Sequence, residues 1–144
     1  HQLAMPVVYY SPITFLYWYD LPNVYKGEQE LDFWKHCPTV WDESKALDGE
    51  IGEYIVQARR SGNDWFVGAM NGLTARDITL ITSEFLQKGK KYRVEIYNDD
   101  PSLKTRTKVT STVMTIKAGK VLKLHLQASG GAALRFVPIS SIFF

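Results

Sequence analysis

Five acidic residues close together in the sequence are the first candidates for chemistry. Asp42, Glu43, Asp48, Glu50 and Glu53 fall within one short polar stretch. Hydrolases that cleave glycosidic bonds use two carboxyl groups, about 5–5.5 Å apart for retention and about 6.5–9.5 Å apart for inversion. The same acids can instead decorate a solvated linker and turn, and we favour this second interpretation. Their spacing also differs from that of a helix–loop calcium site, so we expect no catalytic or metal-binding role for them.

The remaining metal-ligating and nucleophilic residues are scattered. His1, His36, His125 and the single Cys37 lack the spacing of a zinc site. His125 alternates with two leucines, so we expect it on the outer face of a strand. One cysteine excludes an intramolecular disulfide, and the sequence contains no nucleophile elbow, phosphate-binding loop or dinucleotide fingerprint. The sequence therefore predicts no catalytic residue and no metal site.

Positive charge is concentrated in the second half of the chain. Ten Lys or Arg residues lie between Lys88 and Lys123. A nucleic-acid site would interleave such residues with stacking aromatics, but only Tyr92 and Tyr97 accompany them and three acids interrupt them. We therefore expect a solvated sheet face and no nucleic-acid partner. The apolar runs are too short to cross a bilayer, which predicts no membrane partner.

Seven β-prone runs with turn residues between them dominate the chain after residue 53. A Ser-Gly-Asn-Asp turn at 61–64 joins the first two runs, which predicts a β-hairpin. Seven or eight short strands are typical of an antiparallel β-sandwich, which we place within residues 39–137. The runs are 54–59, 65–70, 75–81, 92–97, 108–116, 121–126 and 132–137. The expected core residues are Ile55, Trp65 or Phe66, Val94, Ile96, Leu124 and Leu134.

The alternation of side chains along these strands limits which of them can be buried. The run 92–97 alternates with period two, which predicts one buried face. Trp65 and Phe66 are adjacent in a strand and point to opposite faces, so we expect at most one of them in the core. Trp41 could join them in a platform for carbohydrate, but we expect it to be wedged between two domains.

Residues 1–38 differ in character from the rest. They carry a net charge of −2, against +4 for the remainder. We predict a short helix within 1–10, a strand over 13–19 that is buried on both faces, and an amphipathic helix over 29–36 that ends before Pro38. We therefore divide the chain into 1–38 and 39–144, with Trp41 and Asp42 at the junction.

A strand buried on both faces needs partners. Leaving residues 13–19 in water would expose several large side chains, each worth about 1.5–3 kcal/mol of burial. We expect the segment either to fold back on the sandwich or to be buried against another chain. We favour the second outcome, which predicts a homo-oligomer.

Several stretches, in order, resemble the end of a glycoside hydrolase family 97 chain. They are HQLAMPVVYYSPITF, PTVWDESKALDGEIGEYIVQARR, WFVGAMN, ARDITL, SEFL, KYRVEIYND and GGAALRF. Members of that family have an N-terminal β-sandwich, a central (β/α)8 barrel and a C-terminal β-sandwich. The resemblance implies a mainly β fold, in which an antiparallel β-sandwich at 39–144 follows a small α/β remnant of the barrel at 1–38.

The resemblance also implies a function for a longer parent protein. The family hydrolyses α-glucosidic or α-galactosidic bonds, and its catalytic carboxylates and calcium ligands lie on earlier barrel elements that this chain lacks. We therefore expect no catalytic residue and no cofactor here. Tyr17, Tyr19 and Asp20 end the last barrel strand, the end that faces the active site in such barrels. They are candidates for the substrate face of the full-length protein.

The chain itself is then expected to be inactive, with a structural or oligomerisation role. Its partners would be the rest of the parent barrel or a second copy, and the parent would be periplasmic or extracellular. Two alternatives remain. A free-standing carbohydrate-binding module would need an exposed aromatic strip on one sheet, and a small autonomous enzyme would need two convergent carboxyls in a cleft.

Overall fold

The structure is a computed structural model that describes residues 1–15, 21–26 and 28–140. Among these residues it contains eight antiparallel strands and only short helices. The strands are β1 (Glu43–Glu50), β2 (Tyr54–Ser61), β3 (Asp64–Asn71), β4 (Arg76–Ile81), β5 (Lys91–Asp99), β6 (Val109–Lys117), β7 (Val121–Leu126) and β8 (Gly131–Pro138). The helices are α1 (Met5–Val8) and α2 (Leu31–His36), with 3-10 turns at Pro22–Val24 and Thr82–Glu84. The mainly β, antiparallel prediction is confirmed.

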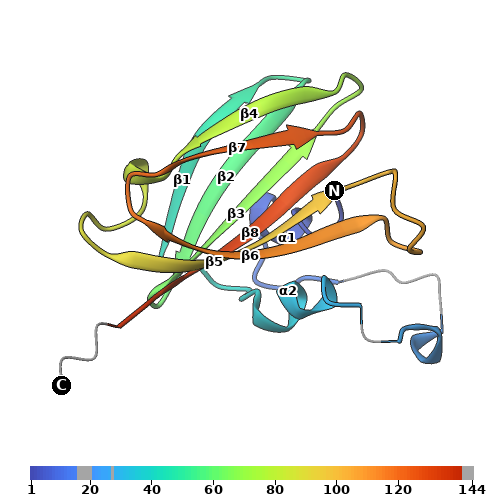
Figure 1. The fold of residues 1–144 in the computed structure, drawn as a ribbon, viewed down its shortest axis with the longest axis horizontal. Coiled ribbons are helices and arrows are strands. Elements are labelled where there is room, and N and C mark those ends of the chain that lie inside the picture. The colour runs from blue at the N-terminus through green and yellow to red at the C-terminus, as the bar shows by residue number, and fades with distance from the viewer. Residues whose placement is uncertain (16–20, 27, 141–144) are drawn as a thin grey trace.

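The strands form two sheets that face each other (Figure 1). The large sheet has the order β1-β2-β3-β8-β5-β6, and the small sheet pairs β4 with β7. The predicted hairpin is the β2–β3 pair, which closes between Ser61 and Asp64. Gly62 takes the first turn position with a φ of 59°, a left-handed conformation that glycine adopts without strain.

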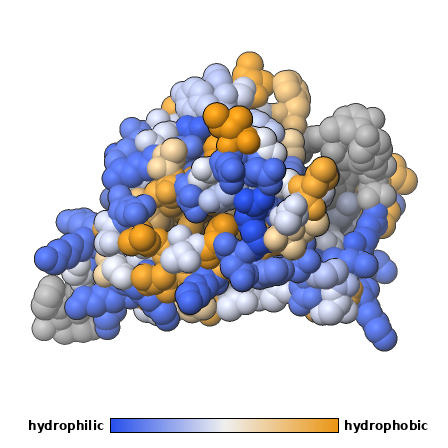
Figure 2. Space-filling model, turned by 90° about the horizontal axis from the view of Figure 1, so that it is seen from above, coloured by the Kyte–Doolittle hydropathy of each residue, from blue (hydrophilic) through white to orange (hydrophobic). Residues whose placement is uncertain are grey.

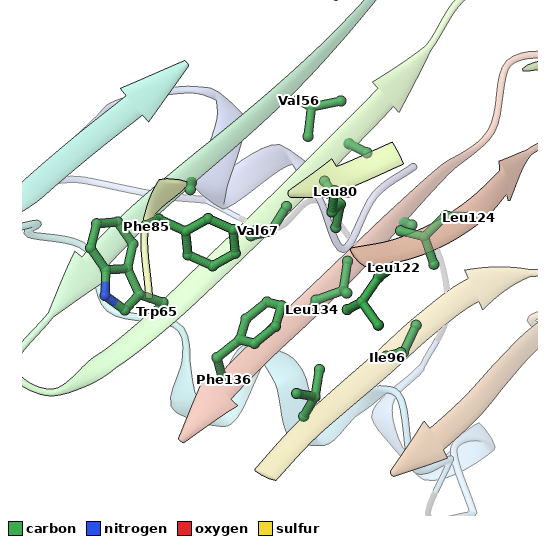
Figure 3. Close-up of a cluster of buried hydrophobic side chains, with 14 of the residues drawn as sticks. Val56, Trp65, Val67, Leu80, Phe85, Ile96, Leu122, Leu124, Leu134 and Phe136 are labelled. Atoms are coloured by element: carbon green, nitrogen blue, oxygen red, sulfur yellow. The ribbon is translucent and has the colours of Figure 1, made fainter. Parts of the chain in front are cut away.

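The core lies between the two sheets. Figure 3 shows Trp65, Phe85 and Phe136 packed together from the large sheet and from the segment after β4. The rings of Phe85 and Phe136 pack edge to face with their centroids 5.2 Å apart, and the centroids of Trp65 and Phe85 are 5.5 Å apart. The expected core residues Val94, Ile96, Leu124 and Leu134 belong to this cluster. Edge-to-face pairs of this kind contribute about 0.5–1.5 kcal/mol beyond their buried area.

Two expectations about the edge of the large sheet are wrong. Ile55 is 37% exposed on the outer face of β2, and the neighbouring Val56 fills the core, because a shift of one residue moves a strand's side chain to the other face. The stretch before it is a strand, β1, rather than a polar turn. Its residues alternate between half-exposed and exposed positions. Backbone pairing with β2 holds this strand in place. Its sequence therefore lacks the alternation of apolar residues that would have predicted a strand.

The central part of the large sheet is covered on both faces. Trp65 and Phe66 do point to opposite faces, but both are buried, at 5% and 2% exposure. As expected, Trp65 belongs to the core between the sheets and Phe66 lies outside it, but the outer face is buried by a second cluster. The same holds for β5, where Glu95 and Tyr97 on the outer face are buried as well as Val94 on the inner face. The described N-terminal residues supply the covering layer.

The predicted helices at the N-terminus are confirmed, and α1 and α2 fold back on the sandwich. They pack on the outer face of the large sheet with Leu3, Val7 and Phe33 buried. For residues 13–19 themselves, folding back on the sandwich and burial against another chain both stay predictions. Ile13 and Phe15 are exposed and do not form the start of the predicted strand, whose remainder lies outside the described residues. Within the described ranges, no helix has the length and apolarity needed to span a membrane.

Candidate functional site

The outer face of the large sheet is the candidate functional site, because it binds a segment distant in sequence. We call it the docking face and define it by Arg59 on β2, Phe66 and Gly68 on β3, Tyr97 on β5, and Ala133 and Arg135 on β8. A sandwich sheet with an exposed outer face normally alternates apolar and polar residues. Here the apolar and small residues on that face form a second cluster with the N-terminal segment.

Glycine makes the docking face flat where α1 lies. A Cβ atom on Gly68 would lie 2.8 Å from the backbone oxygen of Ala4 and 2.9 Å from Cβ of Val7. A Cβ on Gly131 would lie 3.0 Å from Cα of His1. Real Cβ atoms essentially never make contacts shorter than 3.0 Å, so the absence of a side chain at Gly68 permits the approach of α1, and at Gly131 a side chain would crowd His1. Glycine inside a strand is a recognised sign of close backbone approach.

Arg59 fastens the end of α1 to the sheet. Its Nε atom donates to the carbonyl oxygen of Val7 at 2.5 Å and its Nη2 atom to that of Val8 at 3.2 Å. Its Nη1 atom donates to Oγ of Ser44 on β1 at 2.5 Å. The last carbonyls of a helix lack partners within the helix, and this guanidinium supplies them. Burial lowers the pKa of Arg59 from its ordinary value, but an arginine stays charged at any physiological pH.

An aromatic cluster fastens α2 beside it. The ring of Phe66 packs edge to face against Phe33 of α2 at 5.8 Å and against Trp41 at 5.4 Å. Phe33 makes a similar contact with Tyr97 at 5.7 Å. Burial raises the pKa of Tyr97 to about 12 and that of the nearby Cys37 to about 12. Both groups are therefore neutral here and act as apolar packing elements.

Charged residues border the aromatic cluster without opening it to a ligand. Arg135 donates from Nε and Nη2 to one carboxylate oxygen of Asp64, at 3.0 and 2.7 Å. Glu95 is buried and bonds to Arg93, and Nη1 of Arg135 lies 3.9 Å from its other carboxylate oxygen. Each buried charge on this border thus has an oppositely charged partner, as a buried ion requires.

The five acids that suggested hydrolysis are paired or exposed. Glu43 binds Arg60 at 3.2 Å and Lys45 at 3.3 Å, and these bonds lower the pKa of Glu43. A general acid needs the opposite shift, a raised pKa that keeps its proton. The other acids are also bonded or exposed. Asp42 binds Arg60, Asp48 accepts from the Tyr54 hydroxyl, Glu53 binds Arg76, and Glu50 is exposed.

The other predicted residues fall as follows. His125 is exposed on β7, as expected, and bonds to Asp77 across the small sheet at 2.6 Å. Trp41 is buried against Phe66, and Asp42 accepts from the N–H of Gly62 at 2.7 Å. The substrate-face candidates Tyr17, Tyr19 and Asp20 lie outside the described residues and stay a prediction. The described ranges contain no group of three or more His, Cys, Asp or Glu placed to hold a metal ion.

The docking face itself was missed at the sequence level. The glycine at 68 within the apolar run 65–70 was a signal for close backbone approach. Arg59 gave no signal, since an arginine near a strand end is usually solvated.

The match to a known family covers the strands that build this face. Residues 40–137 match the family described as "Glycosyl-hydrolase 97 C-terminal, oligomerisation". The chain belongs to this family. Its membership accounts for the sandwich, and the residues that cover the docking face come mostly from before residue 40.

Relatives of this glycosyl-hydrolase 97 C-terminal domain extend the match to the N-terminal segment. A retaining alpha-galactosidase of Bacteroides thetaiotaomicron is 41% identical over 136 residues, which cover 93% of this chain and 20% of that protein. A solved glycoside hydrolase family 97 enzyme in complex with acarbose, from Pseudoalteromonas sp. strain K8, is 37% identical with a TM-score of 0.84, covering 96% of this chain and 22% of that one. A solved beta-arabinopyranosidase is 30% identical with a TM-score of 0.61, covering 81% and 17%. The chain thus spans about a fifth of the relatives it matches.

Proposed function

We propose that this chain is the C-terminal part of a longer glycoside hydrolase that cleaves α-galactosidic or α-glucosidic bonds. In this proposal the sandwich has no catalytic role. It fastens the last elements of a catalytic barrel through the docking face, and it supports the association of subunits. The observation that carries the proposal is the docking face. There Arg59, the close approach of α1 at Gly68 and the aromatic cluster around Phe66 hold the N-terminal segment on the sheet.

The arrangement of the acids supports an inactive chain. Three of them form ion pairs with basic side chains and Asp48 accepts a hydrogen bond from a hydroxyl, and the pKa of Glu43 is lowered by its partners. We therefore assign the acid and the nucleophile, and any calcium, to the remainder of the parent. From the similarity to the family alone, we propose that the substrate face includes Tyr17, Tyr19 and Asp20, and that the parent acts in the periplasm or outside the cell.

Chain 1–144 should not hydrolyse aryl α-galactosides or aryl α-glucosides, whereas the longer protein should hydrolyse one of them. The assay is release of the chromogenic phenol at matched molar concentrations. Turnover by chain 1–144 that disappears in Glu43→Gln or Glu53→Gln would overturn the proposal. Turnover that neither substitution changes would identify a contaminating hydrolase, which a further purification step removes.

The alternative of a free-standing carbohydrate-binding module has less support. Such a module would need exposed aromatics along one sheet. In the described part of the chain, the aromatics that stand out as exposed are Tyr9, Tyr10 and Phe15, all in the N-terminal segment rather than on a strand. Figure 2 shows apolar residues on the face seen from above as small groups among polar ones. Binding of α-linked oligosaccharides to chain 1–144 by calorimetry would restore this alternative.

A further inference from the structure

The open edges of the two sheets differ sharply in how well they are protected. β1 and β6 end the large sheet, and β4 and β7 form the small one. An open edge presents unpaired N–H and C=O groups that can bind another chain, and proteins block such edges with charged residues, bulges or short strands. The four edge strands can therefore be compared as candidate surfaces for association.

Three of these strands carry such protection. β1 has a register shift between Ala46 and Asp48, and such irregularities interrupt pairing at an edge. β4 and β7 are six residues long. The charged or ionisable residues on these strands are Glu43, Lys45, Asp48 and Glu50 on β1, Arg76 and Asp77 on β4, and Lys123 and His125 on β7.

β6 has none of these features along most of its length. It is nine residues long and pairs with β5 without a register shift, from Lys117 opposite Lys91 to Val109 opposite Asp99. Residues 109–116 are uncharged and mostly β-branched. Val113, at the centre of the strand, is 55% exposed. A long, regular and uncharged edge of this kind is a template for strand addition.

The hydrogen-bond pattern identifies which groups of β6 are free to pair. Just beyond the two ends of the β5–β6 pair, Asp100 donates its N–H to the Lys108 oxygen at 2.8 Å, and Ala118 donates to the Lys90 oxygen at 2.9 Å. Residues of an antiparallel strand alternate between bonding to one neighbour and to the other. Even-numbered residues of β6 therefore bond to β5. Odd-numbered residues, with Val113 at the centre, direct their N–H and C=O groups away from the sheet.

We propose that two copies of this chain pair through the edge of β6, antiparallel and about a two-fold axis at Val113. The two large sheets would then form one continuous sheet. A two-fold contact joins a surface to itself, and Val113 is the midpoint of β6. In this register Ser111 lies opposite Thr115 of the other copy, and Lys117 lies opposite Val109, so no like charges meet. The inference rests on the oligomerisation part of the proposed function and names its surface.

Sedimentation of chain 1–144 from low to high micromolar concentration tests this. The wild type should be a dimer that dissociates on dilution. Val113→Pro removes an outward N–H and leaves the ladder to β5 intact, as proline on an edge strand can. Val113→Lys places a charge opposite its own copy, which is unfavourable. Each should raise the dissociation constant of the dimer at least about ten-fold, a change that sedimentation over this range of concentrations can measure.

The matched control is Val121→Lys on β7, because Val121 is a valine of similar exposure, at 49%. It should leave the dimer unchanged. Thermal melting of each variant checks that it folds, and Val113→Lys decides the question should Val113→Pro fail to fold. Amide hydrogen exchange gives a direct readout, since Ser111, Val113 and Thr115 should become protected as concentration rises while Thr79 and Val121 on the small sheet should not.

The two ways of failing are distinguishable. A wild-type dimer that both Val113 variants leave intact would overturn the β6 edge as the surface, and the proposed oligomerisation role would stand. A wild-type chain that is monomeric at every concentration would overturn both the β6 pairing and association by this chain. Pairing of β6 with other parts of a longer parent would then show as protection of Ser111, Val113 and Thr115 in the longer protein alone.

Discussion

Replacement of Arg59 by methionine should release the N-terminal segment from the docking face. Methionine keeps an apolar stem of similar reach and removes the guanidinium. Three hydrogen bonds are lost, to the backbone oxygens of Val7 and Val8 and to Oγ of Ser44. The Val7 oxygen then lies at a buried residue with no donor to replace the guanidinium, and a buried unsatisfied group costs more than the lost bond alone.

The size of the effect follows from these contacts. A hydrogen bond to a charged group contributes about 1.5–3 kcal/mol. The 3.2 Å bond to Val8 lies at the long end of the normal range, so it falls near the bottom of that interval. The two bonds to α1 together then give about 3–5 kcal/mol of docking free energy. Since about 1.4 kcal/mol is a factor of ten, the opening equilibrium should rise by two to nearly four orders of magnitude.

Native-state amide exchange measures this directly. The N–H groups of Val8 and Tyr9, which donate to Ala4 and Met5, should lose protection by that factor, while strands β2 and β3 keep theirs. A four-residue helix has no stability of its own, so its protection reports docking. Limited proteolysis within residues 1–40 should accelerate in parallel.

The neighbouring arginine provides the matched control. Arg60 is a third exposed and bonds to Glu43 on β1 and to the Gly62 oxygen in the β2–β3 turn rather than to α1. Pairs of this exposure contribute about 0.2–1 kcal/mol, so Arg60→Met should leave the exchange of Val8 and Tyr9 unchanged. Equal exchange in Arg59→Met and wild type would refute the reasoning and assign docking to the aromatic cluster alone.

Two further predictions concern the same face. Gly68→Val should displace α1, since a Cβ there would lie 2.8 Å from the Ala4 oxygen. Circular dichroism should show an intact sheet, while tryptic cleavage near the N-terminus accelerates. A cleavage rate equal to that of the wild type would show that α1 does not need a glycine at this position. Cys37 has a pKa raised to about 12 by burial, from 9.0, so the thiolate forms first in the unfolded chain. The contribution of the protonated thiol to the free energy of unfolding is therefore complete below pH 9 and is lost as pH rises from 9 towards 12. Chemical denaturation should show a smaller loss of stability over that window in Cys37→Ala, and equal losses would argue against a buried thiol.

Some features of this protein follow from local sequence alone. The Ser-Gly-Asn-Asp turn predicts the β2–β3 hairpin because glycine at its first turn position accepts a positive φ. The helix at α2 follows from its amphipathic spacing and the proline after it. These are contacts between residues close in the chain, so their physical causes are visible without the fold. The β-prone runs between turn residues located the remaining strands from β4 to β8.

Other features required the tertiary structure. β1 has no apolar period, because its stability comes from backbone pairing with β2 at an edge, and Ile55 was placed on the wrong face by one residue of register. The burial of both Trp65 and Phe66 could not be predicted, because strand alternation states that two faces exist but not what covers each. The sequence predicted β2 to β8 but not β1. Arg59 bonds to residues 51 and 52 positions before it in the chain. Only this return of the N-terminal segment decided that the outer face would be a docking surface rather than a solvated one.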